Sequence, residues 1–235
     1  MKHISLKPYY DCNNATIEIG IDEVGRGPMI GRVYAAAVIL PKDDSFEHSL
    51  MKDSKRFTSE KKIKIVAEYI KQNAIAYGIG FADEKEIDLI NIRNATHNAM
   101  HRAIQNIIIT SDIDMTQCHL LVDGNDFKPY TFYKEDVGII QIQSTSIVNG
   151  DNTYTSIAAA SIIAKVERDN YIRDLCVQFP DLDTKYDILK NKGYGTKKHL
   201  DGIIKYGITS MHRTSFGICK TFIIDFEKSR AKLLL

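Results

Sequence analysis

The sequence predicts a mixed α/β core followed by a mostly helical C-terminal appendage. Apolar segments with a period of two alternate with segments of helical period, and the composition changes after Pro180. At 235 residues, with 44% hydrophobic and 26% charged side chains, the chain has the size and composition of one large domain with a small addition. We expect an N-terminal extension at 1–14, a core domain at 15–180 and the appendage at 181–235.

Period-two alternation predicts the first strand at 15–22, ATIEIGID, with its isoleucines on one face. Gly25, Gly27 and Pro28 then predict a turn. The apolar segment 32–40 predicts a second strand, antiparallel to the first because the connection is short. Three more strands are expected at 74–82, 118–124 and 138–144.

The helices are predicted from apolar spacing and from their end signals. Thr58 or Ser59 can cap a helix that ends near Lys71, with Glu60 in its first turn. A helix at 151–179 begins with small side chains, SIAAAS, which would let it lie close to a sheet. Other helices are expected at 84–108, at 196–206 and from about Asp225 onward.

Bulk properties exclude some classes of protein. No stretch approaches the roughly 18 apolar residues of a membrane span, and MKHISLKPYYDCNN lacks the apolar region of a secretory signal. The four cysteines form no CxxC pair, so structural zinc or a disulfide framework is not expected. We therefore predict a cytoplasmic protein without a membrane partner. With a net charge of +1, only local basic clusters could bind nucleic acid.

Acidic residues recur where predicted strands end or helices begin. Asp22 and Glu23 end the first strand, Asp123 ends the strand at 118–124, and Asp151 follows Gly150. Two carboxylates about 4 Å apart repel by roughly 4 kcal/mol at an effective dielectric constant near 20, so a group of them needs a cation. Carboxylate oxygens suit Mg²⁺ or Mn²⁺, and two such ions side by side are an arrangement for phosphodiester hydrolysis.

Each acid also has a structural interpretation. Asp151 alone could be a helix N-cap, and Asp123, before Gly124, could be a turn residue. Asp22 and Glu23 are harder to explain in this way, because adjacent strand residues point to opposite faces and a buried unpaired acid is costly. Spacing alone leaves both interpretations open.

The glycine segment does not fit a dinucleotide-binding loop. Such loops follow the pattern G-x-G-x-x-G before a helix, but here Ile30 takes the third glycine position and a strand follows. A nicotinamide enzyme is therefore not expected. Arg26 between two glycines suits a loop whose backbone closely approaches a phosphate or a sugar.

Seven segments, taken in order, resemble the motif series of type 2 ribonuclease H, specifically ribonuclease HII. They are DEVGRGP (22–28), DSK (53–55), LVDGN (121–125), GD (150–151), SIAAASIIAKVERD (156–169), NKGYGTKKHL (191–200) and HRTSF (212–216). The resemblance implies an RNase H-like catalytic domain with a mixed five-stranded sheet flanked by helices. It also implies hydrolysis of RNA in RNA–DNA duplexes and incision 5′ of single ribonucleotides in DNA, leaving 3′-hydroxyl and 5′-phosphate ends.

The motif matches carry residue roles with them. The resemblance implies that Asp22, Glu23, Asp123 and Asp151 are catalytic ligands of two Mg²⁺ or Mn²⁺ ions. It further implies that Gly25, Arg26 and Gly27 read the 2′-hydroxyl at the RNA–DNA junction, and that Tyr194 helps to sense it. This hydroxyl is the group that distinguishes RNA from DNA there.

Substrate phosphates are expected to contact local basic residues, namely Lys55, Lys197 and Lys198. The neighbouring lysines at 61–64 could equally form a solvated helix face. We expect a monomer, and 220–235 lacks the glutamine-led, double-aromatic pattern of a sliding-clamp peptide. Two other functions stay open: an RNase H-like nuclease that cuts DNA, and a duplex-binding module without catalysis.

Overall fold

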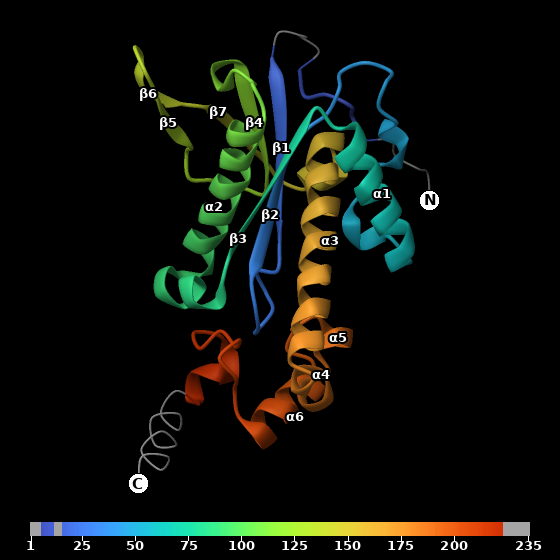
Figure 1. Ribbon diagram of the computed structural model, residues 1–235, viewed down its shortest axis with the longest axis vertical. Coiled ribbons are helices and arrows are strands. Elements are labelled where there is room, and N and C mark those ends of the chain that lie inside the picture. Colours follow the sequence, from blue (N-terminus) through green and yellow to red (C-terminus); the bar gives the residue numbers. More distant parts are fainter. Residues whose placement is uncertain (1–5, 12–15, 223–235) are drawn as a thin grey trace. The chain divides into compact units, whose positions relative to one another are not determined.

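The computed structural model describes residues 6–11 and 16–222. Its main sheet has five strands in the order β3-β2-β1-β4-β7, and β5 and β6 form a separate hairpin (Figure 1). The strands are β1 (Ile17–Val24), β2 (Val33–Ile39), β3 (Ala76–Ala82), β4 (Cys118–Asp123), β5 (Thr131–Lys134), β6 (Gly138–Gln141) and β7 (Gln143–Ile147). The helices are α1 (Glu60–Asn73), α2 (Glu84–Thr110), α3 (Thr155–Gln178), α4 (Asp181–Tyr186), α5 (Ile188–Asn191) and α6 (Lys197–Tyr206).

The sheet is mixed, as the sequence predicts. β1 pairs antiparallel with β2 and parallel with β4, and β4 pairs parallel with β7. The short turn after β1 explains the antiparallel pair, because a parallel partner needs a longer crossover.

The chain divides into two compact units, which are described separately below. The first unit comprises Met1–Val24, Tyr34–Phe81 and Thr96–Glu167, and the second comprises Gly25–Val33, Ala82–Ala95 and Arg168–Leu235. These units are not contiguous in sequence. The expected boundaries of an extension at 1–14, a catalytic domain at 15–180 and an appendage at 181–235 stay a prediction.

In the first unit, helices cover both faces of the sheet. Ala36 and Val38 of β2 pack with α1 and with the alanine-rich start of α3 in one buried cluster. On this face, a Cβ on Gly20 would lie 2.2 Å from a backbone atom of α3, so the missing side chain permits the contact. Gly78 and Gly80 of β3 are close to α2 instead, where a Cβ on either would lie 2.1 Å from a carbonyl oxygen. The helices can approach the sheet closely because the strand residues at these contacts are glycines, which have no side chain.

In the second unit, a smaller apolar core holds the C-terminal elements together. Met29 and Ile30 are buried with the last turns of α3, with α4 to α6 and with Cys219. The segment that follows β1 is thus part of this core rather than a free loop. Among the described residues, no helix is both long and apolar enough to cross a membrane.

Several element boundaries differ from the sequence prediction. The predicted strand at 138–144 is wrong, because two strands separated by Ile142 occupy this region, and β5 was not predicted at all. The N–H of Ile142 donates to the carbonyl of Tyr130 (3.1 Å), so β6 pairs with β5 before β7 joins β4. The predicted helix start at Asp151 is also wrong: α3 begins at Thr155, and Gly150–Asn152 is a 3₁₀ turn. The helix expected from Asp225 lies outside the described residues.

Candidate active site

Two of the predicted acids lie at or near the ends of neighbouring parallel strands: Asp123 is the last residue of β4, and Asp22 lies two residues before the end of β1. Ile21 of β1 pairs with Val122 of β4 in parallel register, so the next positions along the two strands are Asp22 and Asp123. Asp123 in turn pairs with Ile147 at the end of β7. The 3₁₀ turn that carries Asp151 follows this strand. Since the carboxyl ends of parallel strands meet at one sheet edge, the topology gathers these acids there.

Alternation along β1 turns Asp22 towards α3, on the same face as Gly20. The residue is 5% exposed, and its carboxyl group accepts hydrogen bonds from the hydroxyl of Ser161 and from the N–H of Glu23, the latter at 2.7 Å. The side chain of Glu23 alternates to the other face and is half-buried. The two adjacent acids thus have different surroundings, although they are coupled electrostatically.

Burial and mutual repulsion disfavour ionisation of the two most buried acids. Burial raises the pKa of Asp22 well above its ordinary value, and the charges of Glu23 and then Asp123 raise it further. Burial likewise raises the pKa of Asp151, with Asp123 as the next cause. A group of carboxylates in this state would be stabilised by a cation.

The backbone after β7 holds Asp123 in place. The N–H of Gly150 donates to Oδ1 of Asp123 at 2.7 Å, and the N–H of Asp151 lies 3.4 Å from the same oxygen. A Cβ on Gly150 would lie 3.3 Å from that oxygen and 2.6 Å from Ile157. Glycine at this position therefore allows the turn to pass close to the carboxylate.

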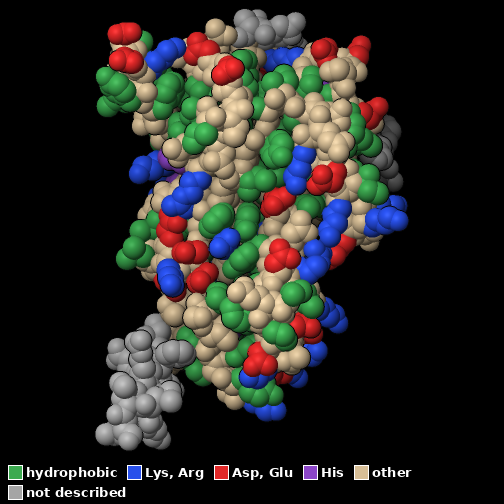
Figure 2. Space-filling model, in the orientation of Figure 1, with side chains coloured by type: hydrophobic (Ala, Val, Ile, Leu, Met, Phe, Trp, Pro, Cys, Tyr) green, Lys and Arg blue, Asp and Glu red, His purple; other side chains and the backbone are tan. Residues whose placement is uncertain are grey.

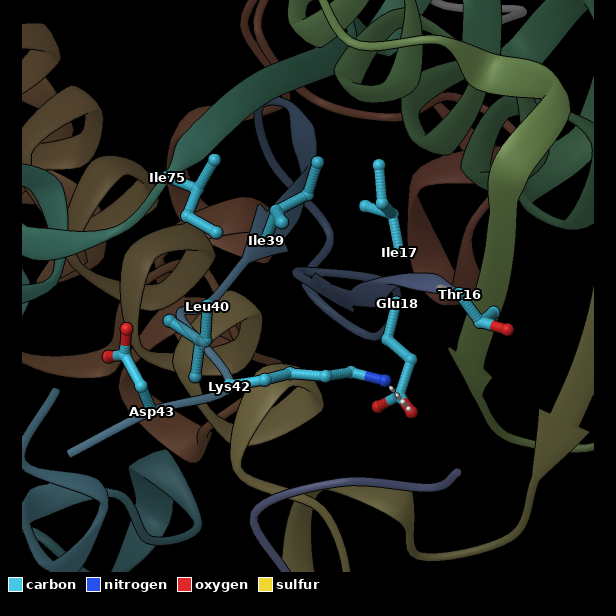
Figure 3. A pocket seen from close by; sticks show the side chains of 8 residues that line it. All are labelled: Thr16, Ile17, Glu18, Ile39, Leu40, Lys42, Asp43 and Ile75. Atoms are coloured by element: carbon cyan, nitrogen blue, oxygen red, sulfur yellow. Dashed lines mark ion pairs between the residues drawn. The ribbon is translucent and has the colours of Figure 1, made fainter. Parts of the chain in front are cut away.

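Glu18 provides a contrast on the same strand. It is as buried as Asp22, at 6% exposure, and alternation places it on the same face. Its carboxylate, however, lies 3.1 Å from the ammonium of Lys42 and accepts the N–H groups of Tyr10 and Asp11 at 3.0 and 2.7 Å. Figure 3 shows this ion pair in a pocket of about 250 Å³, whose apolar lining includes Ile39. Glu18 is thus a structurally neutralised acid, which Asp22 is not.

The predicted junction-reading residues, Gly25, Arg26, Gly27 and Tyr194, all belong to the second unit. Gly25 has a φ of 94°, which favours glycine, while Arg26 and Gly27 are exposed. A Cβ on Gly27 would lie 3.3 Å from the ring of Tyr194, so the ring, itself 46% exposed, packs against the glycine. The N–H of Met29 donates to the carbonyl of Gly193 at 2.8 Å and ties the two loops together.

The predicted phosphate-binding lysines are at separate places. Lys197 and Lys198 open α6, where Thr196 is the N-cap, and Lys198 forms an exposed ion pair of 2.9 Å with Asp187. Lys55 lies in the first unit, in a 3₁₀ turn capped by the side chain of Asp53. Figure 2 shows basic and acidic side chains interspersed over the visible face. On this face, phosphate contacts would therefore rest on local groups rather than on one extended basic surface.

Comparison with known proteins identifies the family. The model of the Ribonuclease HII family matches residues 19–219. The Ribonuclease HII of Bacteroides fragilis is 45% identical over 206 residues, which span 88% of this chain and 92% of the relative. The chain belongs to the ribonuclease HII family. It is therefore a ribonuclease H, a hydrolase of RNA in RNA–DNA hybrids.

Solved structures confirm the RNase H-like fold of this ribonuclease HII family member. The ribonuclease H2 from Pyrococcus horikoshii OT3 matches with a TM-score of 0.65 and 21% identity, covering 90% of this chain and 99% of that one. The structure of Bst-RNase HIII in complex with Mn²⁺ matches with a TM-score of 0.59 and 15% identity, covering 91% and 71%.

The donor set of this ribonuclease HII site fits a divalent cation. Asp22, Glu23, Asp123 and Asp151 supply only carboxylate oxygens, which Mg²⁺ and Mn²⁺ prefer, and at least two of these acids have a raised pKa. No three His, Cys, Asp or Glu side chains among residues 6–11 and 16–222 converge in a coordinating arrangement. Binding would therefore require side-chain rotation, for instance of Asp151, whose Oδ1 accepts a hydrogen bond from Asn152 at 3.1 Å.

Two residues near the acids, Asp53 and Ser161, were not predicted to be site residues from the sequence. The charge of Asp53 raises the pKa of Asp151, after burial and Asp123, while the charge of Lys55 lowers it. The hydroxyl of Ser161 bonds Asp22 and also lies 3.0 Å from that of Ser54. Both belong to recognised segments, DSK and SIAAAS. Their positions depend on packing between α3 and the sheet, which spacing does not reveal.

Proposed function

We propose that this ribonuclease H is a divalent-metal-dependent endonuclease that incises 5′ of single ribonucleotides in duplex DNA as well as within RNA–DNA hybrids. The observation that carries this proposal is the buried carboxylate group at the end of β1 and β4, where Asp22 has a raised pKa and two acidic neighbours. The Mn²⁺ complex of a structural relative supports the choice of metal. The products would carry 3′-hydroxyl and 5′-phosphate ends.

In this proposal, Asp22, Glu23, Asp123 and Asp151 hold Mg²⁺ or Mn²⁺, expected as two ions. Bound ions would supply activation of water and stabilisation of the leaving oxygen. The protein contributes orientation: Ser161 bonds Asp22, and the backbone N–H of Gly150 fixes one oxygen of Asp123. Preorganised ligands of this kind reduce the reorganisation that accompanies catalysis.

We assign the choice of substrate to the loop Gly25–Gly27 and to Tyr194. The exposed glycine backbone permits close approach of a sugar, and the half-exposed tyrosine ring offers a stacking surface and a hydroxyl. In the sequence one residue, Val24, separates this loop from Glu23, one of the proposed metal ligands. Lys55, Lys197 and Lys198 would contact phosphates without reading the base sequence.

The test is cleavage of a labelled DNA duplex with one ribonucleotide, in Mg²⁺, in Mn²⁺ and in EDTA, beside an all-DNA duplex and an RNA–DNA hybrid. We expect a single cut 5′ of the ribonucleotide, dependent on metal and absent from the all-DNA duplex. Asp22→Asn and Asp123→Asn should remove cleavage, while Asp44→Asn, a change at an exposed acid, should retain it.

The other outcomes separate the competing functions. Cutting of the all-DNA duplex would assign a different nuclease specificity. Binding without cleavage under every metal condition would favour a duplex-binding module. Cleavage of the hybrid alone would retain ribonuclease H activity and reject incision at single ribonucleotides.

A further inference from the structure

A buried arginine donates hydrogen bonds to the backbone of the loop that we propose recognises the RNA–DNA junction. The side chain of Arg213 is fully buried, at 0% exposure. Its guanidinium donates to the carbonyl oxygens of Gly25 (2.7 Å), Arg26 (3.0 Å) and Gly31 (2.8 Å). All of these residues belong to the second unit. One side chain therefore fixes three carbonyl groups of a single short segment.

The backbone around Arg213 reinforces these contacts. Its own N–H donates to the carbonyl of Met29 at 2.8 Å, and the N–H of Gly31 donates to the carbonyl of Met211 at 2.9 Å. His212 and Ile30 form an isolated antiparallel bridge between these bonds. Residues 29–31 and 211–213 thus pair as two short antiparallel segments. The guanidinium of Arg213 extends past this pairing to the carbonyl of Gly25.

Burial of this charge is costly, which suggests a geometric reason for keeping it. Burial, and then the charge of Arg168, lower the pKa of Arg213 to about 9, while the charges of Asp88 and Glu84 act in the opposite direction. The planar fork of a guanidinium can reach several acceptors at fixed angles, which a lysine ammonium cannot reproduce. Three carbonyls on one segment match that fork.

The carbonyl contacts also set the direction of the neighbouring N–H groups. In a trans peptide the C=O and the following N–H point in opposite directions. The carbonyls of Gly25 and Arg26 face the guanidinium, so the N–H groups of Arg26 and Gly27 face away from it. These two residues are the exposed part of the loop.

We propose that Arg213 is a positioning residue, which orients the exposed N–H groups of the loop Gly25–Gly27 and thereby sets the preference for a ribonucleotide over a deoxyribonucleotide. This inference rests on the proposed junction-reading function of that loop. Arg213 is fully buried and contacts the backbone of the loop, so its effect on specificity would pass through the loop.

In the HRTSF segment, the ring of Phe216 packs against the guanidinium of Arg213, 5.1 Å from its centre, whereas His212, Thr214 and Ser215 have other contacts. The Nε2 atoms of His212 and His199 lie 3.1 Å apart. The N–H groups of Thr214 and Ser215 donate to the two carboxylate oxygens of Asp88, at 2.7 and 2.9 Å.

The experiment compares the full chain with Arg213→Lys, which keeps the charge but loses the fork. Dissociation constants are measured in EDTA, where we expect no cleavage, for two duplexes that differ only in one 2′-hydroxyl. The preference is the dissociation constant for the all-DNA duplex divided by that for the single-ribonucleotide duplex. We expect this ratio to fall about tenfold in the variant, which corresponds to the loss of roughly one hydrogen bond. Affinity for the all-DNA duplex should be nearly unchanged. With Mg²⁺, kcat/KM for the single-ribonucleotide substrate divided by kcat/KM for the hybrid substrate should fall as well.

Tyr186→Phe is the matched control for lost stability. It removes the bond from a buried hydroxyl to the carbonyl of Gly207 (3.0 Å) within the same unit, but does not touch the glycine loop. We expect it to lower Tm and leave the binding ratio unchanged. If Arg213→Lys does not fold, Arg213→Gln replaces it, since an amide can still bond two of the carbonyls.

A folded Arg213 variant with the wild-type ratio would overturn the positioning role and leave the proposed function intact. A wild-type chain without any preference for the ribonucleotide duplex would instead reject junction reading, and the role of Arg213 with it. An equal loss of ratio in Tyr186→Phe would show that general loosening of the unit is responsible, which also overturns the inference.

Discussion

Single residues in this protein show how the same side-chain type takes different roles through its neighbours. Glu18 and Asp22 lie on one face of β1 and are both buried, but Glu18 has Lys42 as a counter-ion. For Asp22, burial is the largest cause of a raised pKa, and the charges of Glu23 and then Asp123 raise that pKa further. A buried acid among acids is expensive in the metal-free protein, which fits the metal-binding role that we propose for it.

Asp22→Asn should therefore remove cleavage and make the metal-free protein more stable. The amide can still accept the N–H of Glu23 but carries no charge, so we expect the free energy of unfolding to rise by about 1–2 kcal/mol. Urea denaturation in EDTA measures this change. Mg²⁺ should raise Tm of the wild type more than that of the variant. Asp44→Asn, a change at an exposed acid, is the control and should behave as the wild type. A less stable Asp22→Asn protein would contradict the conclusion that the charge of Asp22 destabilises the metal-free fold.

The histidine pair predicts a pH dependence of stability. The N–H of Thr209 donates to Nδ1 of His212 (2.9 Å), so the proton of the neutral ring is on Nε2 and points to His199. His199 Nδ1 lies 3.0 Å from the carbonyl of Tyr194 and donates to it. Burial, and then the charge of His199, lower the pKa of His212 to about 3.

Between about pH 6.5 and 3 the unfolded chain binds a proton at His212 that the folded chain does not. Stability should therefore fall as the pH falls through this window, with this residue contributing on the order of 1.4 kcal/mol per pH unit. His212→Asn should give a shallower slope than the wild type in urea denaturation between pH 7 and 5. Parallel slopes would mean that His212 does not remain neutral when folded.

At the scale of elements, α2 is two helical segments with a break at Asn91. This residue has φ 68° and ψ 162°, and its side-chain oxygen accepts the N–H of Asn94 at 3.1 Å. It therefore ends the first segment and caps the second. The boundary between the compact units, at Ala95 and Thr96, follows soon after.

Two substitutions at this break separate the backbone contribution from the cap. Asn91→Ala loses the cap and must adopt a positive φ, so we expect a loss of about 1–3 kcal/mol in the free energy of unfolding. Asn91→Gly accepts that φ readily and should cost only a few tenths of a kcal/mol. Thermal and urea denaturation of the pair measure the difference, and equal losses would show that φ at this position does not matter.

At the scale of the whole molecule, the charge of the chain is nearly balanced. The net charge is +1, and acidic and basic side chains are mixed over the face shown in Figure 2. In the function that we propose, affinity for a duplex comes from a few lysines, among them Lys197 and Lys198. Lys198 already pairs with Asp187, but its side chain is 75% exposed and such pairs contribute little.

Joint replacement of Lys197 and Lys198 by alanine should weaken binding to all duplexes alike. Each lost phosphate contact should reduce the slope of log K against log salt by about 1, without changing the preference for a ribonucleotide. Fluorescence anisotropy at several salt concentrations measures both quantities. Lys61→Ala with Lys62→Ala tests the alternative that those lysines are only a solvated helix face. A change in ribonucleotide preference in the Lys197 and Lys198 variant would contradict phosphate contact as their role.

The sequence by itself determined the family, the mixed five-stranded sheet and most strands and helices, because period, turn residues and motif order are local properties. It placed Asp22, Glu23 and Asp123 near strand ends for the same reason, and it placed Asp151 at the start of a helix. Local pattern could not separate β6 from β7, since the break at Ile142 comes from the pairing of β6 with β5. Nor could it start α3 at Thr155 instead of Asp151, because a 3₁₀ turn intervenes.

Only the tertiary structure decided which acids are neutralised and which are not. Glu18 and Asp22 look alike in the sequence, and the difference comes from Lys42, which lies beyond β2. The three carbonyl contacts of Arg213 likewise join positions more than a hundred residues apart. Charge interactions act through space, so their outcome depends on which segments the fold brings together.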